Sequence, residues 1–272
     1  MTRTERLSGR PQRVYRFVYG WEPVTEGLSL KGGSPDRFLL EPVTGAAIVY
    51  DEGWVLFDTG FNPETIRDPV RRAVHYANLD PYYCYIGCIP RGDPLLRQVE
   101  AAGLDWSALA LGVISHLHCD HSGGLRLFVD GPPVALQSAE HEFANDGAGL
   151  EHAFFRTDYQ LPGLTWRLVE GEVELAPGLR AIPTFGHTPG HMSLAVELPT
   201  RTVVLAGDAA DLRINIERSI PCGSTTHPDL EPAAARAIER LHQLDTTPGI
   251  EVWPSHDPDF WGDGQSPPRW DR

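Results

Sequence analysis

A six-residue segment running from His116 to His121 holds three histidines and one aspartate. It directly follows the apolar run from Leu109 to Ser115, which we expect to be a β-strand with the cluster at its carboxyl end. His116 and His118 are two positions apart, and side chains with that spacing on an extended chain point to the same side. Neutral imidazoles and a carboxylate on a loop that can wrap around an ion are suitable metal ligands. The cluster therefore predicts a metal site at the end of a strand.

Three later segments also place a candidate ligand at or just beyond an apolar run. They contain His187 and His191, Asp208, and His256, in that order. A single histidine or aspartate at the end of a strand is more often structural than functional. Together with the first cluster, however, these residues complete one ligand set. Gly123 and Gly124 follow the first cluster, and we expect them to let the backbone turn tightly there.

The remaining pattern alternates strands with helices. The turn at Asp51 to Gly53 between two apolar runs predicts a hairpin that ends at Asp58-Thr-Gly60. A stretch rich in glycine and proline runs from Gly20 to Pro35. The sequence thus favours an α/β or α+β fold with helices covering the sheets. Expected strands are Val14–Tyr19, Gly45–Tyr50, Trp54–Phe57, Leu109–Ser115, Pro133–Gln137, Arg180–Thr184, Ser193–Leu198, Thr202–Ala206 and Ile250–Trp253, and expected helices are Pro63–Asn78, Asp93–Ala102, Ser138–Asn145 and Asp229–Leu244.

Charge and composition exclude several classes of partner. The 272 residues suit one large domain, and the formal net charge of -14 disfavours both a nucleic-acid surface and docking on anionic lipid. The first residues are charged and lack the apolar core of a signal peptide, and no run approaches the ~18 apolar residues of a membrane span. We therefore expect a cytoplasmic protein that acts on a small molecule, without nucleic-acid or membrane partners.

The ordered set of ligand motifs resembles the metallo-β-lactamase superfamily. The resemblance rests on His-X-His-X-Asp-His, Gly-His-Thr-Pro-Gly-His, Gly-Asp and a C-terminal Ser-His-Asp, and it extends from about Gly45 to His256. It implies a four-layer αββα sandwich with the site at one edge. We expect one hydrolase domain over residues 1–272, with an N-terminal extension over residues 1–44.

The resemblance also implies a role for each residue of the motifs. Two divalent metal ions are expected, most simply Zn²⁺, with Fe, Mn and Co as alternatives. Asp208 would bridge the ions, Asp120 would also be a candidate proton shuttle, and Asp58 would orient a ligand imidazole. His187 would stand behind the ligands, because the family uses the second histidine of that motif. The implied ligands are His116, His118 and His191 for the first ion, Asp120, His121 and His256 for the second, and Asp208 for both.

Within the superfamily, the sequence is most similar to the N-acyl-homoserine lactone lactonases, which open the lactone ring and so quench quorum sensing. The bridging aspartate differs from the true β-lactamase pattern, and we expect no C-terminal glutathione-binding region like that of the glyoxalase II thioesterases, since 16 residues follow His256. One position departs from the lactonases: Asp211 stands where they often have a tyrosine that contacts the substrate carbonyl. Tyr82, Tyr83, Tyr85 and Tyr159 are candidates to replace it.

Two alternatives to a lactonase stay open at this point. One is another small-ester or thioester hydrolase of the same fold, similar to glyoxalase II. The other is a metal-binding module without catalytic activity, which the complete ligand set disfavours. The sequence leaves the acyl-chain preference and the oligomeric state open, a homodimer included.

Overall fold

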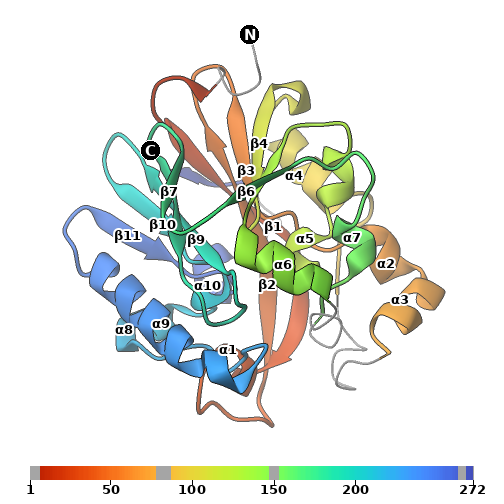
Figure 1. The fold of residues 1–272 in the computed structure, drawn as a ribbon, viewed down its shortest axis with the longest axis vertical. Coiled ribbons are helices and arrows are strands. Elements are labelled where there is room, and N and C mark those ends of the chain that lie inside the picture. Colours follow the sequence, from red (N-terminus) through yellow and green to blue (C-terminus); the bar gives the residue numbers. More distant parts are fainter. Residues whose placement is uncertain (1–6, 78–86, 147–152, 263–267, 272) are drawn as a thin grey trace.

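Two β-sheets form the centre of the molecule (Figure 1). The structure is a computed structural model and describes residues 7–77, 87–146, 153–262 and 268–271. The larger sheet has, in spatial order, β12 (Trp270–Asp271), β1 (Arg13–Thr25), β2 (Phe38–Val49), β3 (Trp54–Phe57), β4 (Leu109–Val113), β5 (Val134–Gln137) and β6 (Trp166–Val169). The smaller sheet has β11 (Ile250–Trp253), β10 (Thr202–Leu205), β9 (Met192–Glu197), β8 (Leu179–Pro183) and β7 (Val173–Ala176).

The helices lie between these strands along the chain, and several are a single turn long. In chain order they are α1 (Glu26–Ser29), α2 (Pro63–Arg67), α3 (Pro69–His75), α4 (Pro94–Ala101), α5 (Cys119–Ser122), α6 (Ser138–Asp146), α7 (Arg156–Tyr159), α8 (Arg213–Arg218), α9 (Glu231–Asp245) and α10 (Pro258–Trp261).

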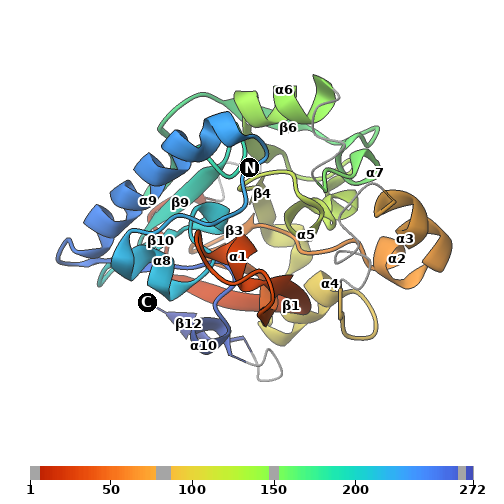
Figure 2. The ribbon, with the colours of Figure 1, turned by 90° about the horizontal axis from the view of Figure 1, so that it is seen from below.

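Three buried hydrophobic clusters define four layers. Alternate residues of a strand face opposite sides of its sheet. On β1, Val14 packs between the two sheets, whereas Phe17 packs on the outer side of the larger sheet with Leu95 of α4. A third cluster joins the smaller sheet to Ile238 and Leu241 of α9. Figure 2 shows α9 against the strands β9 and β10, with α4 on the far side of the larger sheet. The order of layers is therefore αββα, as the family resemblance implies.

The hairpin and most strands lie where the sequence predicts them, but the N-terminal strand is longer than expected. β1 continues through Gly20 to Thr25, inside the stretch rich in glycine and proline, and pairs with β2 along its whole length. The register shifts between Val18 and Gly20. A Cβ at Gly20 would lie 2.6 Å from the backbone oxygen of Cys88, so this glycine permits a close crossing of two chain segments.

Two predicted helices differ from the observed ones. The helix expected over Pro63–Asn78 is two helices, α2 and α3, since the Asp68 side chain caps the second helix and Pro69 cannot extend the first; Asn78 lies outside the described residues. The last long helix begins at Glu231 and not at Asp229, because Asp229 lies in a preceding 3₁₀ turn. The side chain that accepts a backbone N–H in that turn belongs to His227.

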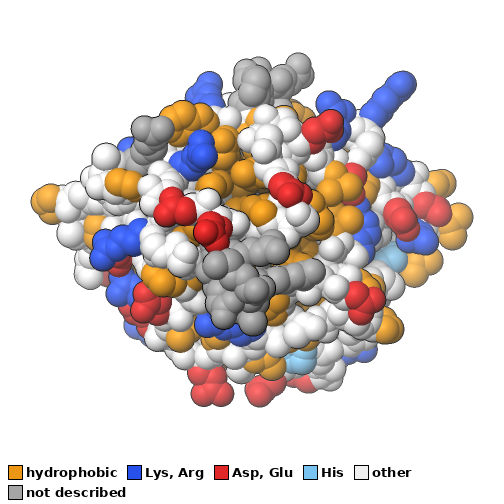
Figure 3. Space-filling model, turned by 90° about the horizontal axis from the view of Figure 1, so that it is seen from above, with side chains coloured by type: hydrophobic (Ala, Val, Ile, Leu, Met, Phe, Trp, Pro, Cys, Tyr) orange, Lys and Arg blue, Asp and Glu red, His pale blue; other side chains and the backbone are white. Residues whose placement is uncertain are grey.

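The face drawn in Figure 3 carries both acidic and basic side chains. Acidic and basic side chains are interspersed there among hydrophobic ones, without one continuous basic area.

Among the described residues, the longest helix is α9 with 15 residues. None of the helices in these ranges has both the length and the apolar character needed to cross a bilayer.

Candidate metal centre

The carboxyl ends of four strands bring three predicted ligands and Asp58, the residue expected to orient a ligand, to one place. Asp58 follows β3 directly, and His116 follows β4, which is parallel to β3. Asp208 follows β10, and His256 follows β11, which is parallel to β10. Parallel strands end at the same edge of a sheet, and the two sheets are packed face to face. Residues that are far apart in the sequence therefore meet at one edge of the sandwich.

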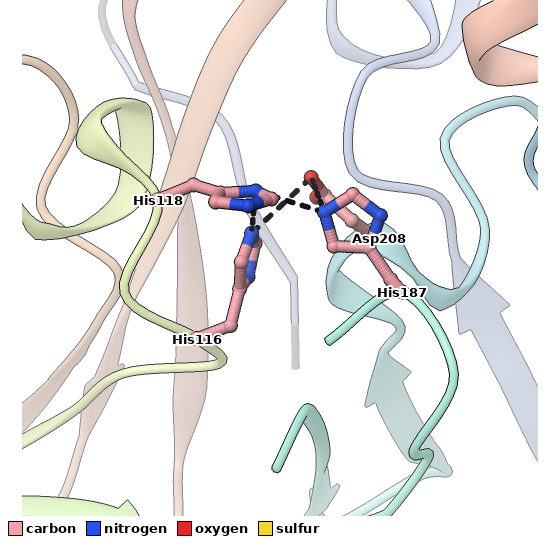
Figure 4. A group of neighbouring side chains, drawn as sticks. All are labelled: His116, His118, His187 and Asp208. Atoms are coloured by element: carbon pink, nitrogen blue, oxygen red, sulfur yellow. Dashed lines mark hydrogen bonds and ion pairs between the residues drawn. The ribbon is translucent and has the colours of Figure 1, made fainter. Parts of the chain in front are cut away.

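The first group of possible ligands consists of His116, His118, His187 and Asp208, whose ligand atoms lie within 4.8 Å of one another (Figure 4). The Nδ1 atom of His118 is 2.9 Å from the Nε2 atom of His116 and 2.9 Å from that of His187. A neutral imidazole has one nitrogen with a proton and one with a lone pair, so three converging ring nitrogens can present lone pairs to a common position. A cation suits that arrangement.

The second group consists of Asp120, His121, Asp208 and His256, also within 4.8 Å. The Nε2 atom of His121 is 3.0 Å from Oδ2 of Asp120 and 3.2 Å from Oδ1 of Asp208. The Nε2 atom of His256 lies 3.0 Å from the same Asp208 oxygen. All four side chains are buried. Two carboxylates and two imidazoles form a ligand set of the kind that divalent zinc, manganese or iron accepts.

Asp208 belongs to both groups, and its two oxygens face different ones. Its Oδ2 atom lies 3.6 Å from Nε2 of His116 and 3.5 Å from Nε2 of His187. Its Oδ1 atom faces His121 and His256. A carboxylate in this position could join two cations, one on each oxygen.

Unpartnered buried nitrogens support a metal at this place. The Nε2 atoms of His118 and His191 are buried and have no hydrogen-bond partner among the described residues, whereas Nε2 of His121 has the carboxylates of Asp120 and Asp208 beside it. Buried polar atoms in proteins are nearly always hydrogen-bonded, because the loss of water is otherwise uncompensated. Two such atoms, on rings that both neighbour His116, fit residues that are arranged to coordinate an ion.

The electrostatics of the two groups differ. Burial lowers the pKa of His116 and of His118 well below the ordinary value, and it lowers that of His191 to about 3. These rings are therefore neutral, as metal ligands must be. Burial also lowers the pKa of His121, but the carboxylates of Asp120 and Asp208 outweigh it and raise the pKa well above the ordinary value. The carboxylates of the second group therefore favour positive charge beside them, which a bound cation would supply.

Other groups orient the ligand rings through the nitrogen that faces away from the centre. The Nδ1 atom of His121 lies 2.9 Å from Oδ2 of Asp58, as the resemblance implies for that aspartate. The Nδ1 atom of His191 is 2.9 Å from the hydroxyl of Thr184, and that of His256 is 2.9 Å from the backbone oxygen of Pro42. Such partners fix the tautomer and the direction of a ligating ring.

The family resemblance implies His191 as the ligand and places His187 behind the ligands, but the group of converging side chains contains His187 and not His191. His187 is in the first group, whereas His191 lies beside it, with its ring centre 5.2 Å from that of His116. A Cβ on Gly207 would approach Nε2 of His191 to 2.6 Å, so glycine is needed next to this atom. The unpartnered Nε2 of His191 keeps it a candidate ligand, and its role remains a prediction.

The glycines after the first histidine cluster serve a different purpose from the expected one. Gly123 has a φ of -63° and Gly124 a φ of -88°, which any residue can adopt. A Cβ on Gly123, however, would lie 2.0 Å from the backbone nitrogen of Asn62. Glycine therefore lets α5 pack directly against the loop that follows Asp58, which holds Asp120 and His121 close to that carboxylate.

Asp211, the position that departs from the lactonase pattern, is buried beside His256. Its backbone oxygen accepts the N–H of His256 at 2.8 Å, and its Oδ1 atom accepts from the Ser255 hydroxyl at 3.4 Å. Of the tyrosines considered as replacements, Tyr159 donates its hydroxyl to the backbone oxygen of Ala144, so this hydroxyl is engaged in the outer helical layer. Tyr82, Tyr83 and Tyr85 lie outside the described residues.

Two buried acids near the centre were not identified from the sequence. Glu22 and Glu41 are directly paired across β1 and β2, so their side chains share one face. Burial, followed by the charge of Asp120, raises the pKa of Glu22 well above its ordinary value. Burial raises the pKa of Glu41 to about 7, although His256 opposes the rise. The only sequence signal was an acid in each of two neighbouring strands, which does not place either of them beside Asp120 or His256.

Comparison with known proteins agrees with this architecture. Residues 40–256 match the profile of the metallo-beta-lactamase superfamily. An N-acyl homoserine lactonase of Bacillus cereus is 32% identical over 246 residues, covering 82% of this chain and 90% of the relative. The N-acyl homoserine lactonase AttM of Azorhizobium caulinodans is 29% identical over 233 residues, covering 81% and 83%.

Solved structures show the same fold. An N-acyl homoserine lactone hydrolase with its product N-hexanoyl-L-homoserine at the catalytic metal centre superposes with a TM-score of 0.75. The two chains are 23% identical, and the match covers 92% of this chain and 95% of that one. The family profile, the relatives and the edge at which the histidines gather all agree: the chain belongs to the metallo-beta-lactamase superfamily.

Proposed function

We propose that this chain is a dinuclear metal-dependent hydrolase that opens the lactone ring of N-acyl-homoserine lactones. The observation that carries the proposal is the position of Asp208, whose two carboxylate oxygens face two different groups of ligands. A single metal site has no need for a second histidine and aspartate cluster around the other oxygen. The unpartnered buried nitrogens of His118 and His191, and the contact of His121 with both Asp120 and Asp208, support the same arrangement.

The ligands we propose follow from the motifs and the contacts. His116, His118 and His191 would hold one ion, with His187 in contact with the same group; Asp120, His121 and His256 would hold the other; and Asp208 would hold both. We propose Zn²⁺ for both positions, because histidine-rich ligation with carboxylates suits it. When bound, two such ions supply Lewis-acid polarisation of a carbonyl oxygen and lower the pKa of water.

The chain's own residues supply the proton transfer. In the hydrolysis of a lactone, water adds to the ring carbonyl, the ring C–O bond breaks, and the products are a carboxylate, an alcohol and a proton. We propose Asp120 as the group that accepts the proton of the water and delivers it to the departing ring oxygen. Its Oδ2 atom is 3.0 Å from Nε2 of His121 and 3.8 Å from Nε2 of His256, so it lies within the cluster. Asp58 would hold the His121 ring in the orientation that this requires.

The choice of lactones as substrate rests on the relatives. Several proteins that cover most of this chain are described as N-acyl homoserine lactonases, including those of Bacillus cereus and Azorhizobium caulinodans. Asp211 is not one of the proposed ligands, although its backbone oxygen accepts the N–H of His256, and the proposed chemistry uses no side chain at that position.

The test is a substrate panel on the zinc-loaded protein. Acid release is followed by pH-stat for N-hexanoyl-homoserine lactone, an S-acyl-glutathione thioester and a β-lactam. We expect kcat/KM for the lactone to exceed that for either other substrate by at least about 100-fold, which is about 2.7 kcal/mol of transition-state stabilisation. Good thioester turnover without lactone turnover would replace this proposal with the thioesterase alternative.

The Asp208→Ala variant tests whether lactone hydrolysis depends on the proposed bridging carboxylate. This aspartate lies at the end of a strand and outside the hydrophobic clusters, so the variant should fold and lose most lactone turnover. Asp229→Ala, at an exposed aspartate in the turn before α9, is the control and should behave like the wild type. An Asp208→Ala protein that retains the wild-type kcat would contradict the bridging role.

A further inference from the structure

Glu140 is a fully buried carboxylate that the proposed chemistry does not use. Its side chain is 0% exposed, although it lies in the first turn of α6, a helix of the outer layer. Removal of an ionised carboxylate from water is costly unless donors compensate for the lost hydration. Its partners therefore indicate why it is there.

The two oxygens of Glu140 contact two different histidine loops. Oε1 accepts the backbone N–H of Leu117 at 3.0 Å, and Leu117 lies between His116 and His118. Oε2 accepts the hydroxyl of Thr188 at 2.6 Å and the backbone N–H of Gly190 at 3.0 Å, both in the loop that joins His187 to His191. The first loop follows β4 of the larger sheet, and the second joins β8 to β9 of the smaller sheet.

The chemistry of these contacts specifies a carboxylate. Two of the three partners are backbone N–H groups, which only donate, and three donors meet two acceptor oxygens. The pKa of Glu140 reflects the same balance: burial raises it to about 7, while the bonds from Thr188, Leu117 and Gly190 lower it. A Cβ on Gly190 would lie 2.1 Å from the backbone nitrogen of Glu140, so glycine is required for the loop to approach the helix this closely.

We propose that Glu140 is a positioning residue that joins the two histidine loops and sets the distance between their imidazoles. The carboxylate holds the backbone beside His116 and His118 at a fixed distance from the backbone beside His187 and His191. Those rings are thereby held at metal-binding separation before an ion arrives. This inference rests on the proposed metal-dependent function, but it concerns how the ligands are arranged and not which substrate is used.

Glu140→Gln tests the idea with little change in volume. An amide has one acceptor oxygen and one NH₂ group, so in either orientation the NH₂ group faces a backbone N–H, that of Leu117 or that of Gly190. One histidine loop should then move. We expect the affinity for Co²⁺ to fall about 10- to 100-fold, the range that is typical when a group supporting metal ligands is lost. We also expect an altered visible absorption spectrum of bound Co²⁺, and a fall in kcat with little change in KM.

Asp158→Asn is the matched control. Asp158 is also a buried carboxylate whose pKa burial raises to about 7, but it bonds the Asn62 side chain and neither histidine loop. It should retain the wild-type Co²⁺ affinity and spectrum. If Glu140→Gln does not fold, Thr188→Val removes one of the three bonds almost isosterically and should shift the Co²⁺ spectrum in the same direction, to a smaller extent.

The outcomes separate this inference from the proposed function. A Glu140→Gln protein of reduced stability that keeps the wild-type Co²⁺ affinity and spectrum would overturn the positioning role, and so would a Thr188→Val protein with both unchanged. If the wild type binds Co²⁺ but does not hydrolyse lactones, the substrate proposal fails while the spectra still decide the role of Glu140. If the wild type binds no Co²⁺ or Zn²⁺, both proposals fail.

Discussion

Asp58→Asn should weaken metal binding without disturbing the backbone. Asp58 has a φ of 55°, in the left-handed region, where aspartate and asparagine are the residues other than glycine that are best tolerated. Alanine at this position would add backbone strain and confuse the result. Asparagine tests the carboxylate alone.

The contacts of Asp58 give the size of the effect. Its Oδ2 atom is 2.9 Å from Nδ1 of His121 and accepts the Ser115 hydroxyl at 2.8 Å, and its Oδ1 atom accepts the Ser115 N–H at 2.8 Å. An amide can direct its oxygen at His121 or at the Ser115 N–H, but not at both, so the orientation or the tautomer of the ring changes. Loss of such support typically costs 10- to 100-fold in metal affinity, which is about 1.4 to 2.7 kcal/mol.

The assay is Zn²⁺ competition against a chromogenic chelator at equilibrium. Asp105→Asn is the control, because Asp105 accepts the N–H and the hydroxyl of Ser107 just as Asp58 does those of Ser115, but it is exposed and lies outside the metal centre. We expect the control to bind Zn²⁺ like the wild type. Equal Zn²⁺ affinity in Asp58→Asn and the wild type would refute the claim that this carboxylate supports His121.

Two further predictions concern the histidine loop and the pH dependence of stability. His191→Ala should lower the zinc content, measured by elemental analysis, more than His187→Ala does; the reverse order would make His187 the ligand, as the geometric grouping alone favours. Burial raises the pKa of Asp158 from 3.8 to about 7, so the stability that its protonated form contributes is complete below pH 3.8 and is lost as the pH rises through 7. Relative to the wild type, Asp158→Asn should therefore gain up to about 4 kcal/mol in free energy of unfolding between pH 4 and pH 8, measured by urea denaturation; a difference that does not vary with pH would contradict this.

The convergence of the candidate metal ligands could be predicted from the sequence, because several of these residues closely follow apolar strands. His116, Asp208 and His256 each lie within three residues of a strand end, and a parallel arrangement of those strands brings their ends together. The hairpin that leads to Asp58 was equally clear, since a short turn with glycine separates two apolar runs. In these cases a local pattern determines the position of the functional side chain.

Other features depend on contacts between distant segments and leave no local pattern. Glu140 lies on a helix whose sequence resembles an ordinary exposed helix, and its role follows only from loops that reach it from two sheets. The extension of β1 through Gly20 depends on pairing with β2, which overrides the low strand preference of glycine and proline. The buried positions of Glu22 and Glu41 likewise follow from the register of β1 against β2.

The most direct test of the central claim is a stoichiometric titration of metal-free protein with Zn²⁺. The rate of N-hexanoyl-homoserine lactone hydrolysis is measured at each addition, with bound zinc determined by elemental analysis. Because Asp208 faces two ligand groups, full activity should be reached only when two ions are bound per chain. Full activity at one bound ion, or two bound ions without lactone hydrolysis, would contradict the account.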